Sequence, residues 1–205
     1  DIDLSLEKAL MIAEIESKSG VTSTFFIMLR NDFYNIFSKK GTEIINNIVT
    51  LGHQIGLHFD CSAYPQNFTN KELSQACLDE CKAINGWFNI NIEIISYHRP
   101  GKVVMSGDHS ISHPLHHTYM PLYTSKISYK SDSRGEWKYG HPLESQAFKN
   151  RKPLHILTHP IWWNKQPIAP YQNLQKFIDD SNHSKEHYLS ENNTVYRVGE
   201  FSEKD

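Results

Sequence analysis

Apolar positions along the chain alternate between helical spacing and the denser pattern of buried strands. Residues 4–18 and 42–51 place leucine, isoleucine and alanine side chains at helical spacing. Residues 22–29 and 53–59 are rich in β-branched and aromatic side chains, as buried strands are. The pattern continues with a helix expected over 71–84, strands over 92–97, 127–130 and 154–158, and a helix from about 170 to about 180. This alternation predicts βα units and an α/β fold with a mostly parallel sheet or barrel.

Length, composition and charge narrow the class of protein. A chain of 205 residues with 39% hydrophobic and 21% charged residues fits one globular domain with a sizeable core. The formal net charge of −2 gives no electrostatic reason to expect a nucleic acid or an anionic membrane surface as a partner. No apolar run approaches the length of a membrane span. Three cysteines, an odd number, argue against a disulfide framework.

Polar side chains follow the predicted strands where each of them ends. In α/β folds, ligands and chemistry gather at the carboxyl ends of the strands. The candidate site residues are therefore Asp1 and Asp3 before the first helix, His58 and Asp60, His98 and Arg99, Asp132 and Trp137, and His159 with Trp162 and Trp163.

Each candidate also has a purely structural interpretation. Asp3 could be the N-cap of the helix that follows it. His53 and His58 differ in parity, so an extended strand turns only one of them to the site, and His53 is expected to be structural. Arg99 could form a surface salt bridge, and tryptophans are more often buried than exposed at a sugar site.

In this order, the strand-end segments resemble the polysaccharide deacetylase superfamily (NodB homology, carbohydrate esterase family 4), and in particular the deacetylase-like proteins of bacterial surface-polysaccharide gene clusters. The resemblance runs from Asp1 to about Trp163, and its most specific part is GHQIGLHFD at 52–60. It implies a distorted (β/α) barrel of about seven strands in a single domain over 1–205. The leading strand is expected to be missing, since a helical pattern directly follows Asp1-Ile2-Asp3. The expected location is the bacterial cytoplasm, although a lost leader would change that.

The resemblance also implies roles for individual residues. Asp1 would be the general base and Asp3 a metal ligand, with His58 as the first histidine of the metal motif. The remaining roles fall to Arg99, which would orient the base, to Asp132 with Trp137, which would tune the catalytic histidine, and to His159, which would be the general acid.

The chain departs from the family pattern at one metal ligand. The second histidine of the metal motif should stand at position 62, which is Ser62, and a hydroxyl is a poor zinc ligand. Strand parity favours Asp60 as the replacement, because residues 58 and 60 share a face of an extended strand. Chemistry favours His98, because a neutral imidazole binds Zn²⁺ well and Asp60 would add a third carboxylate beside Asp1 and Asp3. We expect His98 to be the third ligand and Asp60 to bind substrate.

The expected activity is hydrolysis of an amide C–N bond that releases an acyl group, above all acetyl, from an N-acetylated sugar of a surface polysaccharide or its precursor. The expected cofactor is a divalent metal ion, with Zn²⁺ as the first candidate. Trp137 and Trp162 are the expected sugar-binding side chains. Two alternatives stay open, a metal-independent amidohydrolase on the same fold and an inactive carbohydrate-binding homologue.

Overall fold

A computed structural model describes residues 1–65, 67–106, 110–111 and 113–199. The chain divides into two compact units, Asp1–Trp163 and Asn164–Asp205. The first unit carries all the strands and every candidate site residue named above, and the second contains one long helix. The predicted domain over 1–205 stays a prediction.

The helices are α1 (Leu6–Lys18), α2 (Lys39–Thr50), α3 (Asn70–Phe88), α4 (Lys102–Met105), α5 (Gln146–Lys149) and α6 (Pro170–Asn192). The strands are β1 (Thr24–Ile27), β2 (Gln54–Asp60), β3 (Ile94–His98), β4 (His116–His117), β5 (Ser128–Ser131) and β6 (Leu154–Leu157). Short helical turns lie at η1 (Cys61–Ala63), η2 (Leu122–Lys126), η3 (Ser133–Gly135), η4 (Pro142–Glu144) and η5 (Pro160–Trp162), and the other described residues form loops.

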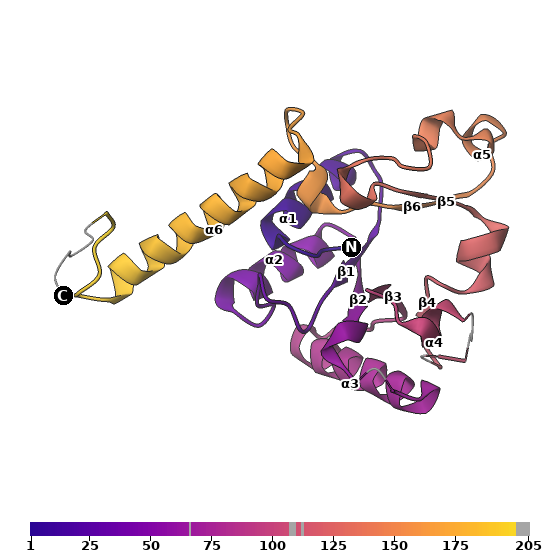
Figure 1. The fold of residues 1–205 in the computed structure, drawn as a ribbon, viewed down its shortest axis with the longest axis horizontal. Helices are drawn as coiled ribbons and strands as arrows, with labels where there is room; N and C mark the ends of the chain where they lie inside the picture. The colour runs from indigo at the N-terminus through magenta and orange to yellow at the C-terminus, as the bar shows by residue number, and fades with distance from the viewer. Residues whose placement is uncertain (66, 107–109, 112, 200–205) are drawn as a thin grey trace. The chain divides into compact units, whose positions relative to one another are not determined.

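The strands form two parallel sheets. Strands β1 to β4 pair in sequence order, and β5 pairs with β6 (Figure 1). The predicted α/β class with parallel strands is confirmed. The expected barrel of about seven strands is not found in the described residues, which hold six strands in two separate sheets. The short β4 is followed by a helical turn at η2 rather than by a strand that continues the ladder, so the first sheet ends at β4.

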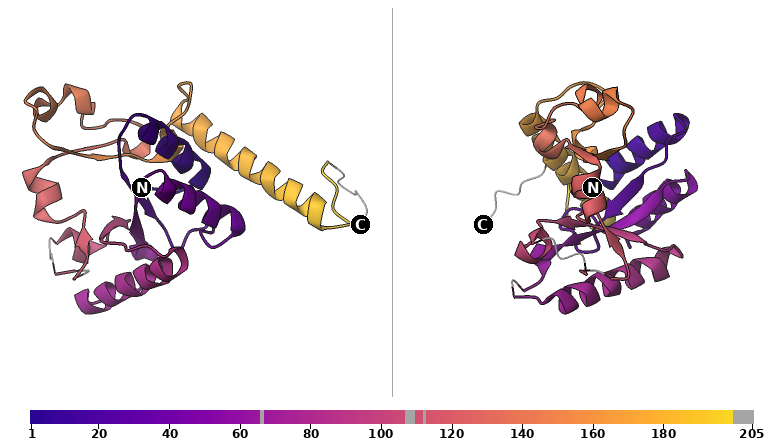
Figure 2. Two further views of the ribbon diagram at one scale, coloured as in Figure 1. Left: turned by 180° about the vertical axis from the view of Figure 1, so that it is seen from behind. Right: turned by 90° about the vertical axis from the view of Figure 1, so that its right-hand side faces the viewer.

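Buried isoleucine and leucine side chains hold the first unit together. Helices α2 and α3 are the crossovers of β1-α2-β2-α3-β3 and both pack on β2, while α1 packs on α2 (Figures 1 and 2). Ile45, Leu57 and Ile95 are fully buried in the shared core. Gly56 is required on β2, because a Cβ there would lie 2.6 Å from the Phe26 ring. Gly56 therefore leaves room for the Phe26 ring where β1 pairs with β2, the strand that also carries His58.

The first three residues lie between the two sheets. The amide of Ile2 donates to the carbonyl of Phe26 (2.9 Å), and the amino group of Asp1 donates to the carbonyl of Thr158 (2.7 Å). The Tyr34 hydroxyl donates to the Ile2 carbonyl (2.7 Å), and Ser5 rather than Asp3 caps α1. Asp3 is thus free of the capping role, and both carboxylates lie near the carboxyl ends of the strands. Asp1 also lines a cavity of about 970 Å³, whose walls include residues of strands β1 to β6.

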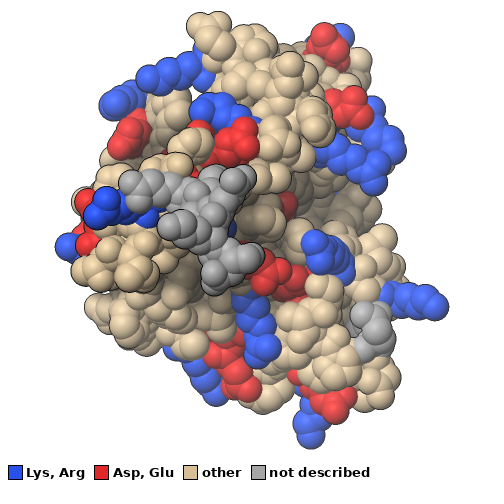
Figure 3. All heavy atoms as spheres, turned by 60° about the vertical axis from the view of Figure 1, so that its left-hand side comes forward, with Lys and Arg blue, Asp and Glu red and all other residues tan. Residues whose placement is uncertain are grey.

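Surface features agree with the small net charge. Acidic and basic side chains of the described residues are interspersed over the face in Figure 3. Within the described ranges, no helix is long and apolar enough to cross a membrane. In the histidine-rich segment 108–117, which the sequence suggests is a polar loop, residues 108, 109 and 112 lie outside the described part, and His116–His117 form β4.

Candidate functional site

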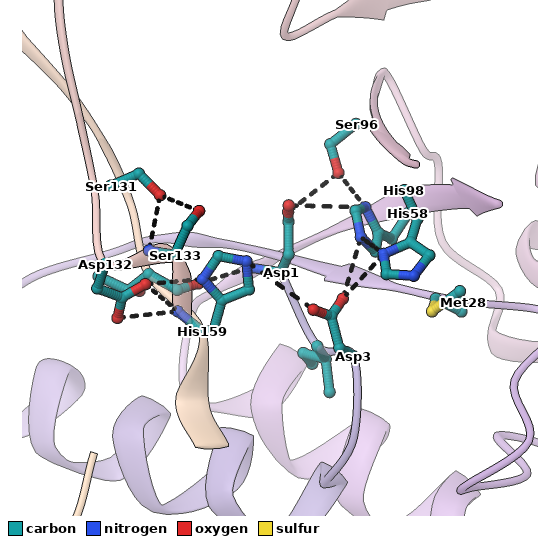
Figure 4. A network of polar contacts seen from close by, with 12 residues as sticks. Asp1, Asp3, Met28, His58, Ser96, His98, Ser131, Asp132, Ser133 and His159 are labelled. Carbon is teal, nitrogen blue, oxygen red and sulfur yellow. Dashed lines mark hydrogen bonds and ion pairs between the residues drawn. The ribbon is translucent and has the colours of Figure 1, made fainter. Parts of the chain in front are cut away.

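Three potential metal ligands converge at the carboxyl ends of β2 and β3. Asp3 Oδ1 lies 3.1 Å from His58 Nε2 and 3.4 Å from His98 Nδ1, and the two ring nitrogens are 3.2 Å apart (Figure 4). All three side chains offer a ligand atom within 4.8 Å of the others. The structure thus places His98 in the cluster with Asp3 and His58.

The register of the sheet explains this arrangement. His58 pairs with Ser96 and Asp60 pairs with His98 in the parallel ladder of β2 and β3. Side chains at paired positions of parallel strands point to the same face, so His98 follows Ser96 onto the face that carries His58. Parity within one strand could not reveal this cross-strand relation.

Asp1 and His58 are joined by a buried serine hydroxyl. Ser96 Oγ donates to Asp1 Oδ1 (3.0 Å) and lies 2.5 Å from His58 Nδ1. The other carboxylate oxygen, Asp1 Oδ2, lies 3.7 Å from His58 Nδ1. The candidate base therefore lies directly beside the cluster, and Ser96 is a site residue that the sequence analysis missed. Its position two residues before His98 on a strand was the available signal.

The cluster changes the proton affinities of its members. Burial lowers the pKa of His58 to about 4, although the neighbouring Asp3 raises it. Burial would raise the pKa of Asp3, but the His58 and His98 rings beside it lower that pKa far below its usual value. Asp3 is therefore an anion and His58 a neutral imidazole at neutral pH, the forms in which both can bind a metal ion.

A second pair lies on the other side of Asp3. His159 Nδ1 is 2.7 Å from Asp132 Oδ1, and the His159 amide donates to both oxygens of Asp132 (3.0 and 3.2 Å). Trp163 Nε1 donates to Asp132 Oδ2 (2.9 Å). Asp132 is buried, and its carboxylate accepts from the His159 backbone N–H and the Trp163 indole N–H, so it serves as an acceptor for the His159 ring as well. His159 Nδ1 therefore carries a proton, and Nε2 points to the site.

The two groups meet at Asp3. His159 Nε2 lies 3.9 Å from Asp3 Oδ2, while Oδ1 of the same carboxylate faces His58 and His98 (Figure 4). A candidate base (Asp1), a candidate metal cluster and a candidate acid (His159) are thus assembled from four separate chain segments.

Other predicted residues lie elsewhere. Arg99 is exposed, has a positive φ of 48°, and donates to Ser62 Oγ (3.4 Å); among the described contacts, Ser96 rather than Arg99 pairs with Asp1. Asp60 Oδ1 accepts from both the amide and the hydroxyl of Ser62 (2.8 Å each). Asp60 and Ser62 thus form the cap of η1 at the rim of the site.

The tryptophans differ from the predicted assignment. The residue beside Asp132 is Trp163, whereas Trp137 packs its ring edge-on against His141 (5.6 Å between centroids). Trp162 is partly buried at the end of η5, three residues after His159. The position of Trp163 four residues after His159 was the available signal for its contact with Asp132.

The donor set fits a divalent metal ion. Zn²⁺ with ligands at about 2.0–2.1 Å in a tetrahedron requires ligand atoms about 3.3–3.4 Å apart. The three separations here are 3.1, 3.2 and 3.4 Å. Asp3 Oδ1 is buried and makes no hydrogen bond to any described residue, so a cation would satisfy it.

Comparison with known proteins returns solved structures only. No model of a known family matches the sequence, and no curated protein matches it. The chain is similar to a CE4 family pseudoenzyme from Bacillus anthracis (15% identity, TM-score 0.48, 89% of this chain and 58% of that one). It is also similar to a deacetylase solved with substrate (17%, 0.40, 89% and 82%). A third is a family 4 acetyl xylan esterase from Clostridium thermocellum in complex with cobalt (14%, 0.39, 85% and 78%).

The likeness is one of fold at low identity. The chain spans about three fifths of the length of the pseudoenzyme structures, 58% and 61% of two of them. The chemistry of the site therefore rests on the chain's own residues. The pseudoenzyme structures are of a CE4 family protein, and the esterase is a family 4 enzyme.

Proposed function

We propose that the chain is a metal-dependent hydrolase that removes an acyl group, above all acetyl, from an N-acetylated sugar of a surface polysaccharide or its precursor. The observation that carries the proposal is the spacing of Asp3 Oδ1, His58 Nε2 and His98 Nδ1, three ligand atoms 3.1–3.4 Å apart with Asp1 beside them. All the groups assigned to the chemistry lie in residues 1–163 of the proposed deacetylase-like domain.

Asp3, His58 and His98 would hold the ion, which as Zn²⁺ would polarise the acyl carbonyl and make water a better nucleophile. Asp1 is placed to accept a proton from the attacking water. His159, held through Nδ1 by Asp132, presents Nε2 to the site and can donate a proton there to the leaving sugar nitrogen. Water and amide are consumed, and a carboxylic acid and an amine are released.

Two tryptophan side chains are the proposed contacts for the sugar. Trp162 follows the acid histidine by three residues and could stack on a sugar face, and Trp137 could do so from the loop after β5. The similarity to an acetyl xylan esterase makes an acetylated carbohydrate the first class to test.

The test measures metal and acetate together. The purified chain is analysed for bound metal, stripped with a chelator, and assayed for acetate release from N-acetylglucosamine oligomers before and after Zn²⁺ or Co²⁺ is added. Metal near one equivalent and metal-dependent acetate release support the proposal. Acetate release by the stripped protein favours a metal-independent amidohydrolase, and oligomer binding with no acetate release favours a binding homologue. Either result overturns the proposal.

A further inference from the structure

The Ser96 hydroxyl lies between two groups of the site. It contacts Asp1 Oδ1 on one side (3.0 Å) and His58 Nδ1 on the other (2.5 Å). Ser96 is 4% exposed and His58 is 2% exposed, so water does not compete for either contact. The three side chains form a chain of hydrogen bonds from the candidate base to a candidate metal ligand.

The donor and acceptor of each of these hydrogen bonds follow from the single proton of the Ser96 hydroxyl. An ionised carboxylate can only accept, so Ser96 donates its proton to Asp1. The serine oxygen then has lone pairs but no proton for His58, and His58 Nδ1 must donate to it. In neutral His58 the other nitrogen, Nε2, is left without a proton.

The unprotonated nitrogen is the one in the cluster. Nε2 of His58 lies 3.1 Å from Asp3 Oδ1 and 3.2 Å from His98 Nδ1. The second nitrogen of a metal-binding histidine generally needs such an acceptor to fix the tautomer.

We propose that Ser96 is a positioning residue that locks His58 as the Nδ1–H tautomer, so that its Nε2 lone pair faces the metal cluster, and that the same hydroxyl holds the Asp1 carboxylate in place. The inference rests on the proposed function only for the metal. In the resembled family an arginine orients the base, but here Arg99 turns to Ser62 and the Asp1 carboxylate is held by Ser96.

The tautomer is tested without any metal. Long-range ¹H–¹⁵N NMR spectra of the metal-free chain report which His58 nitrogen carries the proton. The native protein should show Nδ1–H, and Ser96→Ala should shift the population toward Nε2–H because Nδ1 loses its acceptor. An unchanged Nδ1–H tautomer in Ser96→Ala would overturn the proposal.

Metal affinity gives the second readout. Loss of such an outer partner typically costs about 10–100-fold in metal affinity, so Ser96→Ala should bind Zn²⁺ weaker by this factor in a chelator competition. Ser96→Thr should stay close to the native value, since it keeps the hydroxyl. Ser145→Ala is the matched control, because Ser145 is also buried but bonds only within the η4–α5 turn.

Zn²⁺ binding by the native chain separates this inference from the proposed function. If the native chain binds no Zn²⁺, the proposed function fails while the NMR result still decides the role of Ser96.

If Ser96→Ala does not fold, Ser96→Thr and Ser96→Val replace it, because they match in shape and differ in the hydroxyl. Equal Zn²⁺ affinity and equal tautomer populations in the Thr and Val variants would overturn the proposal, and loss in Val alone would support it.

Discussion

Replacing His98 should weaken metal binding, whereas replacing Asp60 should leave it unchanged. His98 Nδ1 lies 3.2 Å from His58 Nε2 and 3.4 Å from Asp3 Oδ1, so His98→Ala removes one corner of the three-atom cluster. Asp60 Oδ1 is occupied by the amide and hydroxyl of Ser62, so Asp60→Ala removes a turn cap and leaves the cluster intact.

The size of the His98 effect follows from the ligand count. Structural zinc sites bind with an apparent free energy of about 10–16 kcal/mol, and sharing this among four ligands assigns about 2.5–4 kcal/mol to each of them. At about 1.4 kcal/mol per factor of ten, His98→Ala should weaken Zn²⁺ binding ~10²–10³-fold. Asp60→Ala should keep the native Zn²⁺ affinity and lose about 1 kcal/mol of folding stability, the usual cost of a lost cap.

The assay is competition for Zn²⁺ against a chromophoric chelator, with both variants and the native chain measured side by side at one pH. Circular dichroism and chemical denaturation confirm that each variant is folded under the conditions used. If Asp60→Ala loses the metal and His98→Ala keeps it, the ligand assignment is wrong, and the simple parity argument within β2 was the better guide.

Further predictions concern the acid–base groups and the fold. Chelation should abolish acetate release, and Zn²⁺ or Co²⁺ should restore it; full release by the stripped chain would contradict a metal-dependent reaction. Asp1→Asn and His159→Ala should each lower turnover by about 10²–10⁴-fold without unfolding the protein, and near-native turnover in either would refute its role. Trp163→Phe removes one hydrogen bond to Asp132 and should lower kcat with little change in KM; an unchanged kcat would leave Trp163 a packing residue. Burial lowers the pKa of His155, so the unfolded chain binds more protons below its ordinary pKa of about 6.5, and the free energy of unfolding should fall as the pH drops below that value. Denaturation curves of His155→Gln should show a weaker pH dependence than the native chain, and an equal dependence would refute this attribution.

Regular βα units were predictable because their signals are local. The helical stripe over 42–51 corresponds to α2, where Ile44, Ile45 and Ile48 are buried. The strand expected over 53–59 corresponds to β2 (Gln54–Asp60), and the helix expected over 71–84 to α3. The two-residue β4 was missed, since a strand of this length has no periodicity of its own. The alternation of elements left a sheet or a barrel open, and the expectation of a barrel of about seven strands came from the resemblance; the described strands form two separate sheets instead.

Site residues were likewise predictable where their signal was local. Asp3, His58, Asp132 and His159 could be named because each stands at a strand end or in a short motif, and polar groups there are rarely incidental in α/β folds. The pairing of His159 with Asp132 spans 27 residues, yet each of its members was a candidate from its own segment. Ser96 and Trp163 were not given their roles, because a serine on a buried strand and a tryptophan in a turn have many structural uses.

The sequence by itself determined the alternation of elements, the buried faces of α2 and β2, and the set of carboxylates and imidazoles available for chemistry, because these depend on residue type and on spacing within one segment. Only the tertiary structure decided which of them meet. The β2–β3 register brings His98 beside His58. The backbone of Ile2 and the amino group of Asp1 bond to the two sheets, so that Asp3 lies near the residues of both. A turn at Arg99 directs that side chain to Ser62. Each of these depends on contacts between segments far apart along the chain, and local patterns do not encode such contacts.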